Sequence, residues 1–319
     1  MIFLTGLNMS SYDISKELKR KRQLGKIKRN VPLYIIILPM LIATLVFLYI
    51  PMFGLSMAFM DYDVFKGFDS PWVGFSNFKE IISLPSFWQA TLNTLKLSLL
   101  NMVVVFPAPI IFALLLNELR HKAFKRVVQT VSYLPHFLSW IAVVGISSSV
   151  FANYGIINDL RLAVLGDGTE RTMFLSLQGF FVPHVIGLTL WKTLGWDSII
   201  YISAISGIDD QLYEAAVVDG AGKFRQCISI TIPSILPTAV MLFILKVGSL
   251  FKDNFDLIYG LQNPFVDFET ISTLIYKQGI GAGDYSISTG IGLMQGVIGF
   301  GLVMIANYFS KKVNDVALW

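Results

Sequence analysis

Residues 214–237 read EAAVVDGAGKFRQCISITIPSILP, and this polar stretch lies between two strongly apolar runs. The aspartates at 209–210 are suitable N-caps for a short helix over QLYEAAVVD. Gly220 and Gly222 supply the tight-turn geometry that ends such a helix. A second short helix over KFRQCISIT is expected to stop near Pro233, because the residue before a proline disfavours helical geometry. The stretch therefore predicts two short helices joined by a glycine turn.

The composition indicates which class of protein contains this stretch. Of the 319 residues, 54% are hydrophobic and only 14% are charged, whereas about a quarter of the residues in a soluble domain are charged. A polytopic membrane protein is therefore expected. The net charge of +4 does not indicate a nucleic-acid partner, because eight of the 25 Lys and Arg lie in the first 30 residues, directly before an apolar run. Such a cluster is typical of a membrane-topology signal.

Six apolar runs are long enough to cross a membrane as helices of about 20 residues. They cover approximately 31–60, 88–117, 127–151, 178–206, 235–255 and 286–310. Prolines in the first three runs, among them Pro135 in the third, are expected to bend those helices. The predicted fold class is an all-α polytopic membrane protein with six transmembrane helices.

The basic residues predict the orientation of these spans. With the N-terminus inside, the inner segments 1–30, 118–126, 207–234 and 311–319 contain sixteen Lys and Arg, and the three outer loops contain five. Cytoplasmic loops carry such an excess, so both termini of this multi-pass cell-membrane protein are expected in the cytoplasm. The predicted domains are a basic tail, 1–30, a transmembrane domain, 31–310, that includes the cytoplasmic hairpin 207–234, and a C-terminal tail, 311–319.

The hairpin also carries a motif that extends over 20 residues. Its pattern is E-A-A, three residues, Gly, nine residues and I-x-L-P, with Ile232 in place of the usual leucine. The matching and adjoining residues are Glu214, Ala215, Ala216, Asp219, Gly220, Ile230 and Pro233. With this motif the chain resembles the ATP-binding-cassette (ABC) importer permeases, in which it is called the EAA loop. The stretches WVGFSNFKEI at 72–81 and FKDNFDLIYGL at 251–261 look like the carbohydrate subgroup, the maltose-type and LplB-like permeases.

The resemblance implies a permease subunit that is not itself an enzyme. Its hairpin would dock into separate ATPase subunits and act as a mechanical coupling, with the motif residues at the contact. The implied partners are a second permease subunit, two ATP-binding-cassette ATPase subunits, membrane lipid, and an extracellular solute-binding protein that delivers a carbohydrate. No GxxxxGK[ST] phosphate loop is present, and no catalytic residue, cofactor or metal site is expected.

Candidates for the carbohydrate path are aromatic and amide side chains near kinks and span ends, because sugars present both C–H faces and hydroxyls. These candidates are Tyr133, Trp140, Trp191 and Asn254. Polar groups within spans need a partner or a function, because charge in lipid is costly. They are Asn101, Lys192, Asp197 and Lys246. For these four, hydrogen bonding between helices and contact with the substrate remain alternatives.

Two other functions fit part of the sequence. A secondary transporter driven by an ion gradient could use Lys192 and Asp197 for proton coupling, although it would leave the hairpin motif unexplained. An ABC importer of a solute other than a sugar would keep the hairpin and change only the cargo.

Overall fold

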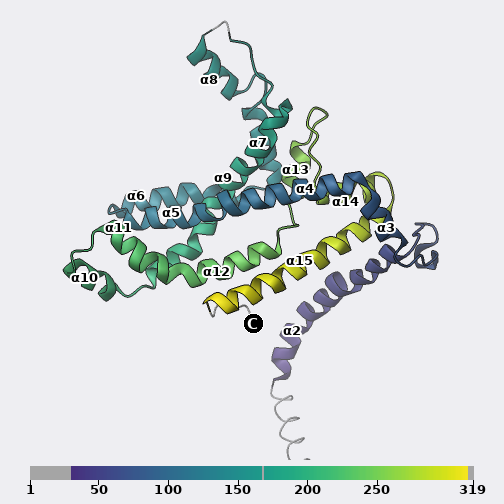
Figure 1. The fold of residues 1–319 in the computed structure, drawn as a ribbon, viewed down its shortest axis with the longest axis horizontal. Coiled ribbons are helices and arrows are strands. Elements are labelled where there is room, and N and C mark those ends of the chain that lie inside the picture. The colour runs from purple at the N-terminus through teal and green to yellow at the C-terminus, as the bar shows by residue number, and fades with distance from the viewer. Residues whose placement is uncertain (1–29, 167–168, 315–319) are drawn as a thin grey trace, which may run out of the picture. The chain divides into compact units, whose positions relative to one another are not determined.

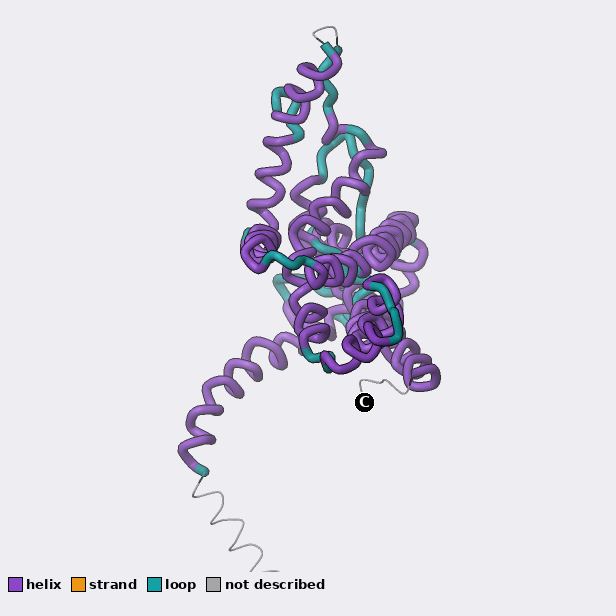
Figure 2. The backbone as a smooth tube through the Cα atoms, turned by 90° about the vertical axis from the view of Figure 1, so that its left-hand side faces the viewer, coloured by secondary structure: helices purple, strands orange, loops and turns teal. Residues whose placement is uncertain are grey.

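The structure, a computed structural model, describes residues 30–166 and 169–314, which form helices joined by turns and loops (Figure 2). Within these residues there is no strand, and one isolated antiparallel bridge joins Met60 to Trp72. The chain divides into two compact units, residues 1–56 and 57–319. Of the predicted tails, only residue 30 and residues 311–314, the end of the last helix, lie within the described residues.

Four helices are long and apolar enough to cross a membrane, and they correspond to the first, second, fifth and sixth predicted spans. They are Val31–Phe59, Pro85–Glu118, Lys223–Gly248 and Tyr285–Phe309. The first consists of α2 (Val31–Thr44), a π-helical segment η1 (Leu45–Tyr49) and a 3-10 segment η2 (Ile50–Phe59). The second consists of α4 (Pro85–Leu100), the π-helical η4 (Asn101–Val105) and α5 (Pro107–Glu118).

The third predicted span, 127–151, is bent near Pro135 as expected, but the bend is a break between two helices rather than a kink within one. The structure has α6 (Lys122–Tyr133), a 3-10 turn η5 (Leu134–Phe137) and α7 (Trp140–Val150), and the two helical parts are bent by 104°. The reason is that Pro135 interrupts the α-helical hydrogen bonds, and Leu138 and Ser139, which follow the 3-10 turn, are extended. Ser139 then starts a new helix, because its hydroxyl accepts a hydrogen bond from the Ala142 amide at 3.1 Å.

The fourth predicted span is the continuous helix α9 (Gln178–Ser206), which contains 29 residues. It is not among the helices that are apolar enough to count as spans in the described part of the chain. Charged and polar side chains such as Lys192 and Asp197 lower its hydropathy. Before it lie α8 (Ile156–Leu165) and the 3-10 turn η6 (Phe174–Ser176).

The hairpin region differs from the prediction after its glycine turn. The first helix is present as α10 (Asp210–Val218). The second helix does not stop at Pro233, because α11 (Lys223–Gln226) continues through the π-helical η7 (Cys227–Thr231) into α12 (Ile232–Gly248). The fifth span therefore begins about a dozen residues before its predicted start at 235, and it ends at Gly248.

Three π-helical segments occur in the same sequence setting, each ending two residues before a proline. They precede Pro51, Pro107 and Pro233. In each, the N–H group of the residue just before the proline bonds to the carbonyl five residues back, as Phe106 does to Asn101 at 2.8 Å. A proline in a regular helix would clash with the carbonyl four residues earlier. The wider turn relieves that clash, and the helix continues.

Beyond α12 the chain forms several short helices before the last span. These are α13 (Phe255–Leu261), α14 (Ile271–Tyr276) and the π-helical η8 (Lys277–Gly281), which lead into α15 (Tyr285–Asn314). Earlier in the chain, the loop after η2 contains the 3-10 turn η3 (Gly67–Asp69) and the helix α3 (Ser76–Ser83). We call residues 254–281 the α13–α14 segment.

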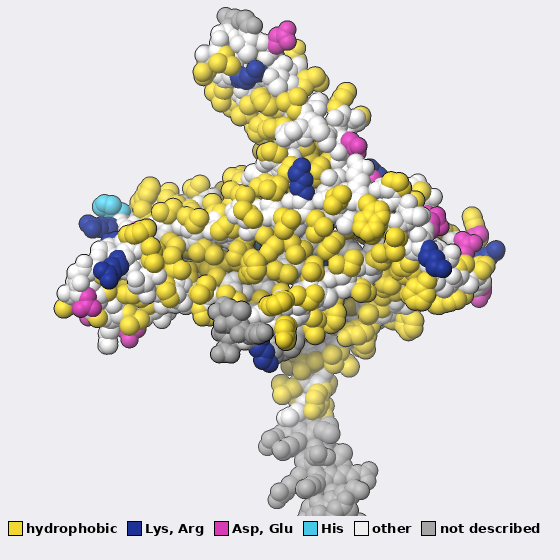
Figure 3. Space-filling model, viewed as in Figure 1, with side chains coloured by type: hydrophobic (Ala, Val, Ile, Leu, Met, Phe, Trp, Pro, Cys, Tyr) yellow, Lys and Arg dark blue, Asp and Glu magenta, His cyan; other side chains and the backbone are white. Residues whose placement is uncertain are grey.

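Three buried clusters hold the second unit together. One joins α4, α9 and α13 through residues such as Leu97, Val185 and Leu257. Another joins α3, α4, α14 and α15, and the third joins α5, α9 and α12. α5 packs along α9, and α12 packs along α15 (Figure 1). On the face drawn in Figure 3, hydrophobic side chains cover the middle of this unit, and charged ones gather at the helix ends near α10 and α3.

The α6–α9 crossing depends on one glycine. Gly195 is buried, and a Cβ atom there would collide with the backbone carbonyl of Ser132. Small residues allow such close approach between membrane helices. α6 therefore lies directly on α9, and the 3-10 turn η5 that follows it also contacts α9.

Candidate functional site

A cavity of about 480 Å³ lies where α4, η4, α7, α9 and α12 meet the turn after Gly248. We call it the central cavity. It brings together Asn101, Trp140 and Asn254 with Lys246, four residues that the sequence singled out separately. They come from four parts of the chain, so no spacing in the sequence could reveal that they share one site.

Three buried polar atoms in the walls of the central cavity have no hydrogen-bond partner among the residues that the structure describes. They are Asn101 Oδ1, Thr193 Oγ1 and Asp253 Oδ1. The other carboxylate oxygen of Asp253 accepts a hydrogen bond from the Ser272 hydroxyl at 2.7 Å. A buried polar atom without a partner costs about 1–3 kcal/mol. Atoms of this kind lining a cavity are suited to bind a ligand with several hydroxyl groups.

Trp140 and Asn254 are fixed in this wall by their places at helix starts. Trp140 is the first residue of α7. Asn254 is the N-cap of α13, and its Oδ1 accepts a hydrogen bond from the Leu257 amide at 3.2 Å. Residues at helix starts are well positioned, because the cap hydrogen bond holds the first turn. The cavity wall therefore holds Trp140 and Asn254 in defined positions.

Lys192 has a structural partner, as expected if it bonds between helices. Its side chain is buried, and Nζ donates a hydrogen bond to the carbonyl of His136 at 2.7 Å. Nζ also lies 5.0 Å from the centre of the Trp140 ring, within range of a cation–π interaction. The His136 ring stacks on Trp196, with their centres 4.2 Å apart. Lys192 thus anchors the break between α6 and α7 onto α9, and it makes no ion pair with Asp197 among the described residues.

Asp197 lines a smaller cavity of about 170 Å³ between α5, α9 and α12. Lys246 lines this cavity as well as the central one. Tyr133 and Trp191 border neither of these two cavities. Tyr133 is half-buried on α6, and Trp191 is 46% exposed on α9. Of the four predicted path residues, the structure brings only Trp140 and Asn254 together.

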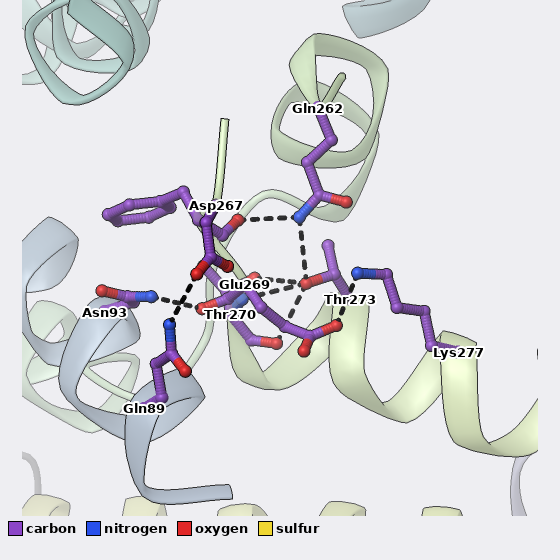
Figure 4. Close-up of polar contacts among 9 residues, drawn as sticks. Gln89, Asn93, Gln262, Asp267, Glu269, Thr270, Thr273 and Lys277 are labelled. Atoms are coloured by element: carbon purple, nitrogen blue, oxygen red, sulfur yellow. Dashed lines mark hydrogen bonds and ion pairs between the residues drawn. The ribbon is translucent and has the colours of Figure 1, made fainter. Parts of the chain in front are cut away.

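The α13–α14 segment contains a polar network that the sequence analysis missed (Figure 4). Amides of α4 reach the segment, with Gln89 Nε2 3.4 Å from Asp267 Oδ2 and Asn93 Nδ2 2.8 Å from the carbonyl of Glu269. Lys277 pairs with Glu269 at 2.8 Å. The signal that could have found it is the density of polar side chains at 262–273.

The hairpin region ends its first helix with a defined capping geometry. Gly220 has φ +75°, and its N–H group donates to the carbonyl of Val217 at 3.0 Å. The amide of Ala221 donates to the carbonyl of Ala216 at 2.8 Å. These two bonds form a Schellman motif, which favours glycine at the left-handed position. Gly222, by contrast, has φ −67° and begins the next helix.

Two side-chain contacts attach α10 and the turn after it to the next helix. The Tyr213 hydroxyl lies 2.9 Å from Thr231 Oγ1, and Gln226 Nε2 donates to the carbonyl of Ala221 at 2.7 Å. Thr231 and Gln226 are both buried. The turn is therefore a rigid element rather than a loose connection.

Most motif residues of the hairpin are on its surface. Glu214, Ala215, Asp219 and Gly220 are exposed, whereas Ala216 and Ile230 are half-buried. Pro233 is exposed on the continuous helix. The neighbouring apolar side chains Val217, Val218 and Phe224 are 61%, 88% and 80% exposed. Glu214 makes no ion pair within the described part of the chain, so this surface offers an acid beside an apolar patch.

Comparisons with known proteins agree over nearly the whole chain. A family model described as "Binding-protein-dependent transport system inner membrane component" matches residues 105–315. Protein LplB of Bacillus subtilis (strain 168) is 40% identical over 300 residues, 93% of each chain. The polygalacturonan/rhamnogalacturonan transport system permease protein YteP of the same strain is 41% identical over 310 residues, 96% of each.

The fold is also that of a solved transporter chain. A chain in the crystal structure of a bacterial ABC transporter involved in the import of the acidic polysaccharide alginate superposes with a TM-score of 0.83. It is 36% identical, and the match covers 92% of this chain and 99% of that one. The chain described here therefore belongs to the family of binding-protein-dependent transport system inner membrane components, and it is a membrane permease subunit of an ABC transporter.

Proposed function

We propose that this chain forms part of the path by which an ATP-driven importer takes up an oligosaccharide. The observation that carries the proposal is the central cavity, with the Trp140 ring and three buried polar atoms that have no hydrogen-bond partner in the described part of the chain. An aromatic face packs on sugar C–H groups, and unpartnered oxygens accept hydrogen bonds from hydroxyls.

The names of the relatives support this cargo and suggest the first probes. One relative is named for polygalacturonan and rhamnogalacturonan, and the solved transporter is described as importing alginate. Lys246 and Lys252 line the central cavity with Asp253 and Asp256, so an acidic sugar meets cations as well as acids there. Oligogalacturonides are therefore the first cargo to test, with malto-oligosaccharides as the neutral series.

The proposal includes six spans with both termini in the cytoplasm. α9 contains 29 residues, and at 1.5 Å per residue it is about 43 Å long, enough to cross a hydrocarbon core of about 30 Å. Lys192, its most deeply buried charge, has a backbone partner and an aromatic partner, which lowers the cost of that charge in the membrane. α6 and α7 would count as one broken span. The domains are then the tails 1–30 and 311–319 and the membrane domain 31–310.

The hairpin 207–234 is proposed to dock on an ATPase subunit. Its apolar Val217, Val218 and Phe224 are exposed, and Glu214, one turn before Val217 and Val218, makes no ion pair with any residue that the structure describes. Apolar anchors beside a charge are typical of interaction sites. The rigid Schellman turn would transmit ATPase movement to α12 through the unbroken helix that begins at Lys223. The proposed assembly also contains two ATPase subunits, a second permease subunit and an extracellular solute-binding protein. In support of the last, one solved relative is described in complex with an alginate pentasaccharide-bound periplasmic protein.

The test is uptake of labelled oligogalacturonides and malto-oligosaccharides into proteoliposomes that contain the complete complex. Wild type should import at least one series, and only with ATP inside. Trp140→Leu should raise the half-saturation concentration two- to tenfold, because an aromatic contact contributes about 0.5–1.5 kcal/mol. Trp191→Leu, whose ring borders no cavity described above, is the matched control and should change it little. Glu214→Ala should weaken ATPase binding and uptake together.

The alternatives give different results in the same vesicles. A secondary transporter would import on an ion gradient without ATP, and Glu214→Ala would leave that uptake unchanged. An importer of another solute would show ATPase binding through the hairpin but no uptake of either sugar series.

A further inference from the structure

A second cavity of about 420 Å³ lies against the α13–α14 segment, and we call it the α13–α14 cavity. Its polar wall contains Gln262, Asp267, Glu269 and Lys277, and Tyr259 supplies an aromatic side chain. Lys277 is 53% exposed although it is paired with Glu269, whose side chain is 19% exposed. The cavity is therefore an open, polar site with one aromatic side.

The polar wall of this cavity is held in place from outside the segment. Gln178, at the start of α9, donates to the carbonyl of Asp267 at 2.7 Å and accepts from its amide at 2.9 Å. Gln262 Nε2 donates to the carbonyl of Phe268 at 2.8 Å (Figure 4). These bonds use backbone groups of the wall and leave the Asp267 carboxylate on its surface, with only a long contact to Gln89.

The helix α13 connects the α13–α14 cavity to the central cavity. Residues 254–258, at its start, line the central cavity, and Tyr259 and Gln262 line the α13–α14 cavity. Phe255 and Tyr259 are four residues apart, on one face of the helix. Their rings stack with centres 5.1 Å apart, so one ring of a continuous pair belongs to each cavity.

A third ring extends this pair across to α14. The Tyr276 ring lies edge-on to Tyr259 with centres 4.9 Å apart, and it lies 5.1 Å from Phe255. The Ser272 hydroxyl, one turn earlier on α14, binds the Asp253 carboxylate at 2.7 Å and so fixes α14 against the start of α13. Tyr259 is nevertheless 42% exposed. The cluster thus combines a fixed position with an accessible aromatic surface.

We infer that Phe255, Tyr259 and Tyr276 form an aromatic subsite that binds the units of an oligosaccharide lying between the α13–α14 cavity and the central cavity. This inference rests on the proposed function. Sugar C–H faces pack on the rings, and Asp267, Glu269 and Lys277 bind hydroxyl or carboxylate groups of the outlying units. A short sugar fits within the central cavity alone. A long one also occupies the subsite, so the subsite selects for chain length.

The test compares sugars of two lengths in the reconstituted complex. Probes are labelled galacturonate oligomers of two and five units, with malto-oligomers of the same lengths as a second series. Tyr259→Ala should raise the half-saturation concentration for five-unit sugars about fivefold and for two-unit sugars less than twofold, the size expected for one lost aromatic contact. Tyr259→Phe keeps the ring, so the ratio of the half-saturation concentrations for the two lengths should be that of the wild type.

The matched control is Phe265→Ala, which removes an aromatic side chain of the same segment that is 69% exposed and lines neither cavity. Phe265→Ala should not change the ratio of the half-saturation concentrations for five-unit and two-unit sugars. If Tyr259→Ala changes both lengths equally, or changes neither, the aromatic subsite is wrong while the proposed function stands. If wild type imports no sugar of either series, the proposed function fails, and the subsite fails with it.

Discussion

The hairpin and the α13–α14 segment are both connections between apolar helices, yet they are built in opposite ways. The hairpin has few buried side chains, and its apolar residues Val218 and Phe224 are almost fully exposed. The α13–α14 segment buries Leu257, Ile271 and Thr273 and is bound by side chains from α4 and α9. The exposed apolar surface of the hairpin is available to a partner protein. The α13–α14 segment is instead stabilised by contacts within its own chain, so it can hold the side chains of a binding site in fixed positions.

The largest effect on stability is expected in the α13–α14 segment, from Thr94→Val. Thr94 is fully buried on α4, and its Oγ1 accepts a hydrogen bond from the Ile271 amide at 2.9 Å. Valine has nearly the same shape but leaves that amide unpaired, at a cost of about 1–3 kcal/mol. Thermal unfolding of the purified complex, followed by circular dichroism, should show a lower midpoint.

The control for this change is Thr91→Val, one turn earlier on the same helix. Thr91 is half-buried and donates to the carbonyl of Phe87, within its own helix, at 2.7 Å. Its loss should lower the midpoint much less. Equal shifts for the two variants would mean that the contact between α4 and the α13–α14 segment is not what stabilises this region.

A smaller, local effect is expected in the hairpin from Gly220→Ala. Gly220 has φ +75°, where a Cβ atom costs about 1–2 kcal/mol. The Schellman turn should open more often, and amides at 220–221 should exchange hydrogen about fivefold to thirtyfold faster. Gly222→Ala, at φ −67° with open space around it, should leave their exchange unchanged. The interpretation of the turn fails if both variants behave alike.

The smallest effect on stability is expected from Val218→Ser, also in the hairpin. Val218 is 88% exposed, so its replacement should change the free energy of unfolding by less than about 0.5 kcal/mol. It should still weaken ATPase binding, measured with purified subunits. Val164→Ser on α8, at a site 82% exposed, should affect neither quantity. If Val218→Ser lowers the free energy of unfolding substantially but leaves ATPase binding unchanged, Val218 stabilises the fold and is not part of a docking surface. The contrast between the two regions would then be wrong.

The sequence predicted those parts of the fold that depend on local chemistry. The ends of α10, with Asp209 as N-cap and Gly220 in the turn, follow from the capping preferences of single residues. The apolar runs likewise matched four helices with the composition of membrane spans. These features need no knowledge of distant residues, which is why they could be read in advance.

The size of the bend near Pro135, the continuation of the helix through Pro233 and the central cavity depend on context, and the sequence did not predict them. Pro135 and Pro233 are both prolines in apolar surroundings, but the chain breaks by 104° after the first and continues through the second. The difference is set by the π-helical turn before Pro233 and by the Lys192 contact that holds the break near Pro135. The central cavity was out of reach for the same reason, since Asn101, Thr193 and Asp253 meet only in the folded chain.

The three π-helical turns before Pro51, Pro107 and Pro233 also set the rotational phase of their spans. Each turn contains one residue more than an α-helical pattern would count, and one residue corresponds to about 100° of rotation. A helical wheel that is fitted to one end of the second or fifth span therefore places the residues at the other end of that span about 100° from their true direction. Asn101 lies at the start of one such turn. Two homologous chains can thus keep the same proline, yet present different faces to the central cavity if one of them lacks the extra residue.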